Sequence, residues 1–184
     1  MGNSDAWEYQ NKKCVIVGGS FAGLEVARRV WDYMDVILID RNDYFEYTCT
    51  MARGLVHGQH IYDINMTYKE YQEKGAKNKV NFIQASLEHV NLDNTIEIKR
   101  VDDGSTQVIP FHYLVIATGG NYGAPLRNQQ NIFIGDRLDH VKEMQNRIKL
   151  ANSVLVVGGG PAGMELIGEI RHLYPDKMVG IMQK

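Results

Sequence analysis

The sequence is poor in cysteine: the 184 residues contain only Cys14 and Cys49. Two cysteines form neither a disulfide framework nor a cysteine-rich zinc site, and their scarcity fits a reducing compartment. No apolar run approaches the ~18 residues that span a bilayer, and no signal-peptide core is present at the start. Neither charge dominates, because the formal net charge is −2 and no basic stripe occurs. These absences argue against nucleic acid as a partner and indicate a globular, cytoplasmic protein.

The first twelve residues are polar and predict an unstructured leader. They carry Gly2, the acceptor position for myristoylation, but Ala6 stands where the usual pattern has Ser or Thr. A lipidated Gly2 with peripheral membrane contact is therefore an alternative to a plain leader. The six histidines show no metal-ligand spacing and no Gly-x-Ser-x-Gly motif occurs, so we expect no metal site.

One arrangement occurs twice: an apolar strand, a glycine cluster, a helix and a second apolar strand. The first copy has strands at 14–17 and 36–39, separated by helical periodicity from Ala22 to Met34. The second copy begins about 140 residues later, with a strand at 154–157. It continues with a helix at 164–173 and a strand at 178–182. Each copy is a βαβ unit.

The segment between the copies predicts further strands. Residues 80–85 form an apolar run, and alternating residues then predict three short strands at 87–90, 95–99 and 107–109. Residues 113–117 predict another fully buried strand, and 138–150 an amphipathic helix. The polar and aromatic segment 41–79 has only an ambiguous helical pattern, around residues 62–73.

The second glycine cluster, Gly158-Gly159-Gly160-Pro161-Ala162-Gly163, is a full G-x-G-x-x-G between a strand and a helix. Gly158 suits the tight turn, Gly160 lets the backbone approach a pyrophosphate, and Gly163 lets the helix pack close to the strand. The helix N-terminus adds N–H donors and partial positive charge, and Pro161 suits its first turn. The cluster predicts a bound dinucleotide.

The first cluster, Gly18-Gly19-Ser20-Phe21-Ala22-Gly23, has Ser20 in place of the middle glycine, which is a mild steric obstacle. Asp40 lies 22 residues after Gly18, at the end of the second strand. A carboxylate there accepts hydrogen bonds from a ribose 2′-OH, and the alternative for Asp40 is a cap or loop carboxylate. A third element, Ala117-Thr118-Gly119, ends the strand that starts at residue 113 and lets a ligand approach closely.

The order of these elements resembles the pyridine-nucleotide-dependent flavin oxidoreductases of the glutathione-reductase-like superfamily. Residues 36–48 and 113–119 are similar to the branch of apoptosis-inducing factor and type II NADH dehydrogenase, and 154–177 looks particularly like its ferroptosis-suppressor type. The resemblance covers nearly the whole chain from residue 13. It implies an α/β fold: a Rossmann-like FAD-binding βαβ with an inserted β-meander, then the start of a second Rossmann-like NAD(P)-binding domain. The expected divisions are 1–12 (leader), 13–125 (FAD-binding), 126–152 (connecting helix region) and 153–184 (NAD(P)H-binding).

The resemblance also implies residue roles. The residues expected to hold FAD are Gly18, Gly19, Ser20, Phe21, Ala22, Gly23, Asp40, Arg41, Leu87, Ala117, Thr118 and Gly119. Those expected to hold NADH or NADPH are Gly158, Gly160, Pro161, Ala162 and Gly163. Glu165, one turn into the second helix, would lie near the nicotinamide and the flavin, and its alternative is a plain helix carboxylate.

The sequence departs from disulfide reductases of this superfamily, since it lacks their early Cys-x-x-x-x-Cys pair. Cys49, nine residues after Asp40, is either a redox cysteine or a small residue near the flavin. Cys14, inside a predicted buried strand, is expected to be inert. Gly135-Asp136 mimics the family's FAD-closing element but precedes the second fingerprint, so Asp136 is expected to be a turn or cap residue.

The resemblance implies a flavoprotein that accepts hydride from NADH or NADPH and passes electrons to a small quinone-like acceptor. One alternative is a truncated nucleotide-binding module without turnover, because the family's remaining nicotinamide domain, FAD-closing segment and C-terminal domain are not among these residues. Another is a single-cysteine NADH oxidase or disulfide reductase that uses Cys49. Gln183 stands near the second carboxylate position, so the sequence does not choose between NADH and NADPH.

Overall fold

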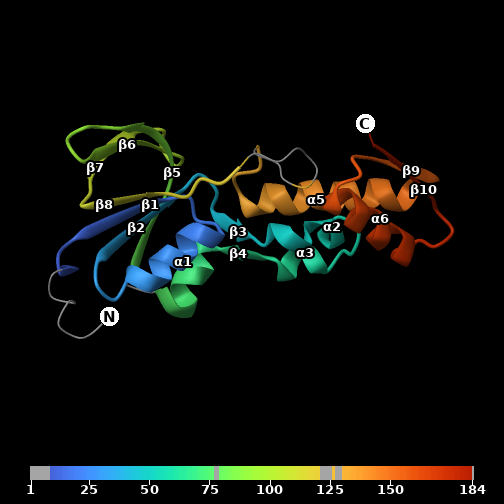
Figure 1. Cartoon of the computed structure of the whole chain (residues 1–184), viewed down its shortest axis with the longest axis horizontal. Helices are drawn as coiled ribbons and strands as arrows, with labels where there is room; N and C mark the ends of the chain where they lie inside the picture. Colours follow the sequence, from blue (N-terminus) through green and yellow to red (C-terminus); the bar gives the residue numbers. More distant parts are fainter. Residues whose placement is uncertain (1–8, 77–78, 121–125, 127–129, 184) are drawn as a thin grey trace. The chain divides into compact units, whose positions relative to one another are not determined.

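The computed structural model describes residues 9–76, 79–120, 126 and 130–183, so Gly2 and most of the leader lie outside the described residues. The chain forms two compact units (Figure 1). The first unit comprises Met1–Phe45 and Thr67–Gly120, and the second comprises Glu46–Met66 and Asn121–Lys184. The segment Glu46–Met66 thus groups with the second unit, although the sequence places it within 13–125.

The first unit is built on a six-stranded sheet with the order β7-β6-β5-β2-β1-β8. Its strands are β1 (Lys13–Val17), β2 (Asp35–Asp40), β5 (Val80–Val90), β6 (Thr95–Arg100), β7 (Thr106–Pro110) and β8 (Tyr113–Ile116). Strands β8, β1, β2 and the start of β5 are parallel, whereas the end of β5 pairs with β6 and β7 in an antiparallel meander. The predicted α/β fold with an inserted meander is confirmed.

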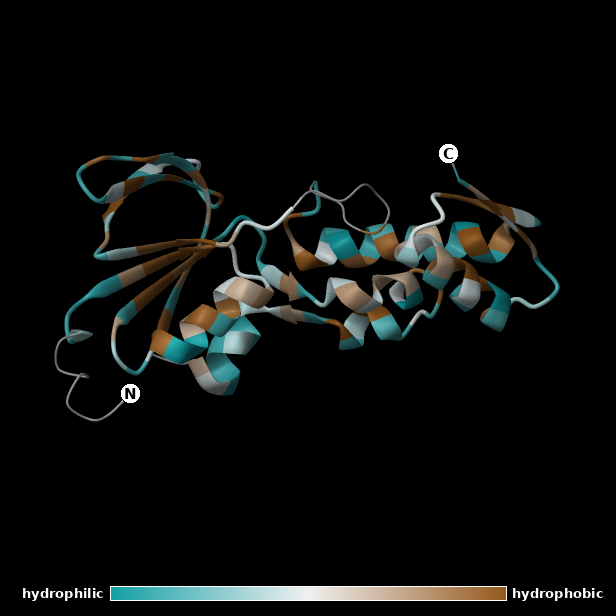
Figure 2. Ribbon diagram, viewed as in Figure 1, coloured by the Kyte–Doolittle hydropathy of each residue, from teal (hydrophilic) through white to brown (hydrophobic). Residues whose placement is uncertain are grey.

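The two faces of β1 bury different cores, because successive side chains of a strand point to opposite faces. Cys14 and Ile16 join one cluster with Ala27 of helix α1 (Phe21–Val30). Val15 and Val17 join a second cluster with the isoleucines of the meander. Figure 2 shows the corresponding apolar colouring along these strands. Burial on both faces explains why β1 is a continuous apolar run.

Two expectations for the strands of the first unit were wrong. Residues 80–85 and 87–90 were expected to be separate strands, but β5 runs unbroken through Val90. The change from a continuous to an alternating pattern marks a change of pairing partner, with a register shift between Leu87 and His89. Strand β8 was expected to be fully buried, yet Tyr113 is 44% and Ile116 is 54% exposed. β8 lies at the edge of the sheet and pairs only with β1 among the described residues.

The segment from residue 44 to 76 consists of short elements. They are β3 (Tyr44–Glu46), η2 (Thr48–Thr50), α2 (Met51–Gly54), α3 (His60–Asp63), β4 (Asn65–Thr67), α4 (Tyr68–Tyr71) and η3 (Gln72–Ala76). Helix α4 begins with a capping box: Thr67 Oγ1 accepts the Glu70 N–H, and Glu70 accepts the Thr67 N–H. The ambiguous helical pattern therefore corresponds to separate single turns.

The second unit contains helix α5 (Ile134–Leu150), strand β9 (Ser153–Val157), helix α6 (Pro161–Leu173) and strand β10 (Met178–Met182). Strands β9 and β10 pair in parallel, which confirms the second βαβ unit. Its core packs Val141 of α5 and Leu166 of α6 against Met51, Leu55 and other apolar residues of the segment Glu46–Met66. No described helix is long and apolar enough to cross a membrane.

Candidate functional site

The two glycine loops have the same backbone geometry. Gly18 follows β1 with a φ of +104°, and Gly158 follows β9 with a φ of +113°. Each N–H donates to the last part of the neighbouring strand: Gly18 to the Ile39 carbonyl at 2.7 Å, and Gly158 to the Met182 carbonyl at 2.8 Å. Because side chains strain this left-handed region, both turns require glycine at this position.

The final glycine of each loop lies under the turn. A Cβ at Gly23 would overlap the Gly18 carbonyl, with the carbonyl carbon at 3.0 Å, and a Cβ at Gly163 would overlap the Gly158 carbonyl, with its carbon at 3.2 Å. Helices α1 and α6 therefore begin pressed against their loops. Ser20 and Gly160 are the N-caps, and neither caps its helix through a side chain. Backbone N–H groups are the donors that a pyrophosphate needs, and the helix dipole adds partial positive charge, so both loops fit a dinucleotide.

The Ala-Thr-Gly element lies against the first loop. A Cβ added at Gly18 would lie only 2.5 Å from the Ala117 carbonyl carbon and 2.9 Å from the Thr118 nitrogen. The Ala117 N–H donates to the Val17 carbonyl at 2.7 Å, which holds the element beside the end of β1. The structure thus brings together Ala117, Thr118 and the glycine turn, which the family resemblance assigns to one FAD site.

Asp40 is the last residue of β2, as predicted, and its carboxylate contacts the first loop. Oδ2 accepts the Gly19 N–H at 2.6 Å, and Oδ1 accepts the Asn42 N–H at 2.9 Å. Two backbone donors fix the plane of this carboxylate at the strand end. Its predicted contact with a ribose stays a prediction, and so do the roles of Arg41 and Leu87. Arg41 has its carbonyl bonded by Gln84 Nε2 at 3.0 Å, and Leu87 packs on the meander core.

Residues 12–182 match the pyridine nucleotide-disulphide oxidoreductase family. The chain belongs to this family. It is 30% identical over 175 residues to ferroptosis suppressor protein 1 of Xenopus tropicalis, covering 94% of this chain and 44% of the relative. It is 29% identical to apoptosis-inducing factor homolog B of Dictyostelium discoideum, covering 95% and 43%. The chain thus spans less than half the length of these curated relatives.

The fold also has counterparts among solved structures. The water-forming NADH oxidase from Lactobacillus brevis, bound to NADH, superposes with a TM-score of 0.71 at 17% identity, covering 94% of this chain and 40% of that one. This likeness concerns the fold. Members of the family are FAD-dependent oxidoreductases that use NADH or NADPH, which agrees with the presence of two loops.

The second loop of this family member differs from the first at the strand end. Gln183 follows Met182 as Asp40 follows Ile39, and these two preceding residues are equivalent, since Met182 pairs with Val157 as Ile39 pairs with Val17. Gln183 Oε1 accepts the Gly159 N–H, which is the counterpart of the bond between Asp40 and Gly19. A neutral amide therefore occupies the position where the first loop has a carboxylate.

The predicted chemical residues of the second unit lie on separate elements. Glu165 is exposed on α6, and Cys49 is exposed in η2. Cys14, by contrast, is buried, and burial raises the pKa of its thiol, as expected for an inert residue. Asp136 lies in the first turn of α5, where an acidic residue favours the helix N-terminus. The roles of Glu165 and Cys49 stay predictions.

Two clusters of charged side chains in the second unit were not predicted from the sequence. Glu169 of α6 contacts Arg53 Nε and His57 Nε2, each at 3.0 Å, which ties the α2 region to the helix of the second loop. Arg137 makes a bidentate pair with Glu46, at 2.7 and 3.1 Å, and also donates to the Leu126 carbonyl at 2.9 Å. No spacing in the sequence identifies these partners.

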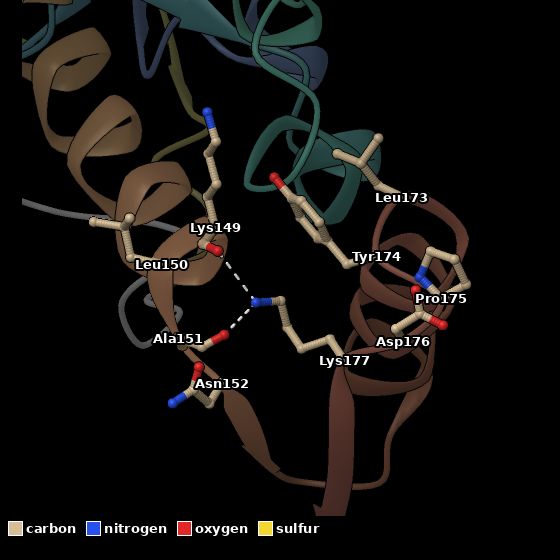
Figure 3. A pocket seen from close by; sticks show the side chains of 9 residues that line it. All are labelled: Lys149, Leu150, Ala151, Asn152, Leu173, Tyr174, Pro175, Asp176 and Lys177. Atoms are coloured by element: carbon tan, nitrogen blue, oxygen red, sulfur yellow. Dashed lines mark hydrogen bonds between the residues drawn. The ribbon is translucent and has the colours of Figure 1, made fainter.

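A pocket of the second unit lies where α5 and α6 end and where β9 and β10 begin (Figure 3). Lys177 Nζ donates to the carbonyls of Lys149 and Ala151 and lies 5.1 Å from the centre of the Tyr174 ring. A lysine bonded to the last carbonyls of a helix caps its C-terminus. The pocket is at the opposite strand ends from the glycine loop, so it is separate from the candidate nucleotide site.

Proposed function

We propose that this chain forms the dinucleotide-binding part of an FAD-dependent oxidoreductase that oxidises NADH or NADPH and passes electrons to a quinone-like acceptor. The observation that carries the proposal is the repeated loop geometry, with a left-handed glycine after each first strand and a final glycine under the turn. The resemblance to type II NADH dehydrogenases supports the acceptor class.

In this proposal the first loop holds FAD and the second holds the nicotinamide dinucleotide. Gly18, Ser20 and Gly23 form the turn and helix start for the FAD pyrophosphate, and Asp40 accepts from the adenosine ribose. Ala117–Gly119 gives the close backbone approach beside that loop. When bound at the first loop, FAD would supply the redox chemistry: hydride transfer from the reduced nicotinamide and passage of electrons to the acceptor. The protein supplies the binding and the orientation.

Two pairs of glycine variants test the assignment of the loops. Gly23→Ala pushes a Cβ into the Gly18 carbonyl, whereas Gly75→Ala adds one where no atom lies within 4 Å. Gly163→Ala and Gly168→Ala form the same contrast within helix α6. We expect the first variant of each pair, and not its control, to lose binding of FAD or of NADH respectively.

The reaction is tested on the purified chain reconstituted with FAD. Flavin absorbance that bleaches on addition of NADH and recovers with a soluble quinone supports the proposal. FAD binding without bleaching would instead favour the nucleotide-binding module without turnover. A chain that binds neither cofactor contradicts the proposal, and a Cys49→Ser variant with full turnover excludes a redox role for that thiol.

A further inference from the structure

Tyr68, the first residue of α4, is a buried aromatic residue beside the first loop. Its side chain is 1% exposed, and its ring stacks on Phe82 with 4.3 Å between the ring centres. Its N–H donates to the Asp43 carbonyl at 3.0 Å. Both the backbone and the ring of Tyr68 are therefore fixed within the first unit.

The Tyr68 hydroxyl contacts the first loop directly. It donates to the Gly19 carbonyl at 2.7 Å and lies 3.4 Å from Asp40 Oδ2. A phenol has one proton to donate, and the shorter contact is the stronger hydrogen bond, so Gly19 is its main acceptor. The ring also restricts this position, because a Cβ at Gly19 would meet the Tyr68 Cζ at 2.6 Å.

These contacts determine the orientation of the peptide between Gly19 and Ser20. In a trans peptide the C=O and the N–H point in opposite directions. Because Tyr68 holds the Gly19 carbonyl on its own side, the Ser20 N–H points away from Tyr68. Ser20 is the N-cap of α1, so its N–H stands at the helix end that fits an anion.

We propose that Tyr68 is a positioning residue for FAD. Tyr68 holds the Gly19–Ser20 peptide in the orientation in which the Ser20 N–H donates to the pyrophosphate. This inference rests on the proposed assignment of FAD to the first loop. The fingerprint itself contains no such residue. The hydroxyl acts through the loop and needs no contact with the cofactor.

The test compares Tyr68→Phe with Tyr71→Phe in the full chain. Tyr71 lies on the same helix, and its buried hydroxyl has no hydrogen-bond partner among the described residues, so it is a matched control. Dissociation constants are measured for FAD, for ADP and for adenosine, which lacks the pyrophosphate. We expect Tyr68→Phe to weaken FAD and ADP roughly three- to tenfold and adenosine less than about twofold. Tyr71→Phe should change none of them.

Unchanged affinities of Tyr68→Phe for FAD and ADP overturn the inference, and so does an equal loss for adenosine, which indicates a merely structural role. A wild-type chain that binds neither FAD nor ADP instead overturns the proposed function. If Tyr68→Phe does not fold, amide NMR of the wild-type chain decides. The Ser20 amide is expected to shift more on addition of ADP than other amides of the loop, and an unmoved Ser20 amide contradicts the proposal.

Discussion

The bidentate pair between Arg137 and Glu46 predicts a large loss of stability when either partner is removed. The Arg137 side chain is 1% exposed and that of Glu46 is 8% exposed, so neither charge is solvated after its partner is lost. Breaking a buried pair on one side costs about 3–5 kcal/mol. That corresponds to roughly a 150- to 5,000-fold change in the folding equilibrium constant. Against a typical total stability of about 5–15 kcal/mol, Arg137→Met or Glu46→Leu alone removes about a fifth or more.

Urea unfolding followed by far-UV circular dichroism measures this loss. The double variant Arg137→Met/Glu46→Leu should recover most of it, because no unpaired charge remains. Recovery is expected to fall short by about 1 kcal/mol, because the Leu126 carbonyl loses a donor. Lys142→Met, which removes an exposed pair with Asp139 on the same helix, should have no measurable effect. Single variants that lose less than about 1 kcal/mol, or a double variant as unstable as the sum of both, refute the reasoning.

Three further predictions concern the loops, the thiols and pH. Gln183→Glu places a carboxylate at the counterpart of Asp40, so the dissociation constant for NADPH should rise more than that for NADH in titrations; equal changes contradict this. A thiol reagent should modify exposed Cys49 rapidly and buried Cys14 only on unfolding. Rapid modification of both cysteines in the folded chain contradicts the burial of Cys14. Hydrogen bonds from Arg28 and then Arg29 lower the pKa of Glu25 from 4.5 to about 2. Because the pKa is lowered in the folded state, ionised Glu25 stabilises the fold above pH 4.5. This contribution is lost as the pH falls from 4.5 towards 2. Glu25→Gln should therefore flatten the dependence of the melting temperature on pH between these values.

The glycine loops could be predicted from sequence because their requirements are local. A left-handed turn between an apolar strand and a helix requires glycine, which stands at positions 18 and 158. The glycines that follow come at the short, fixed spacing of the fingerprint, so the pattern is visible in the sequence. The end of β2 at Asp40 follows in the same way from the length of the βαβ unit. Both were therefore identified without knowledge of tertiary contacts.

The remaining site residues depend on contacts between distant positions. Tyr68 and Gly19 are 49 positions apart, and Arg137 and Glu46 are 91 apart, so no periodic pattern connects them. The capping box at Thr67 marks the start of α4, but it does not reveal what the Tyr68 hydroxyl binds. The exposure of β8 was not predicted for a similar reason, because an apolar sequence does not indicate whether a strand has one or two neighbouring strands in the sheet.

Strand β5 belongs both to the parallel part of the sheet and to the antiparallel meander. One end of this strand pairs with β2, up to Gln84 opposite Asp40, and the other end pairs with β6 from Ala85 onward. No loop therefore separates Gln84, the residue opposite Asp40, from Ala85, the first residue of β5 that pairs with β6 in the meander.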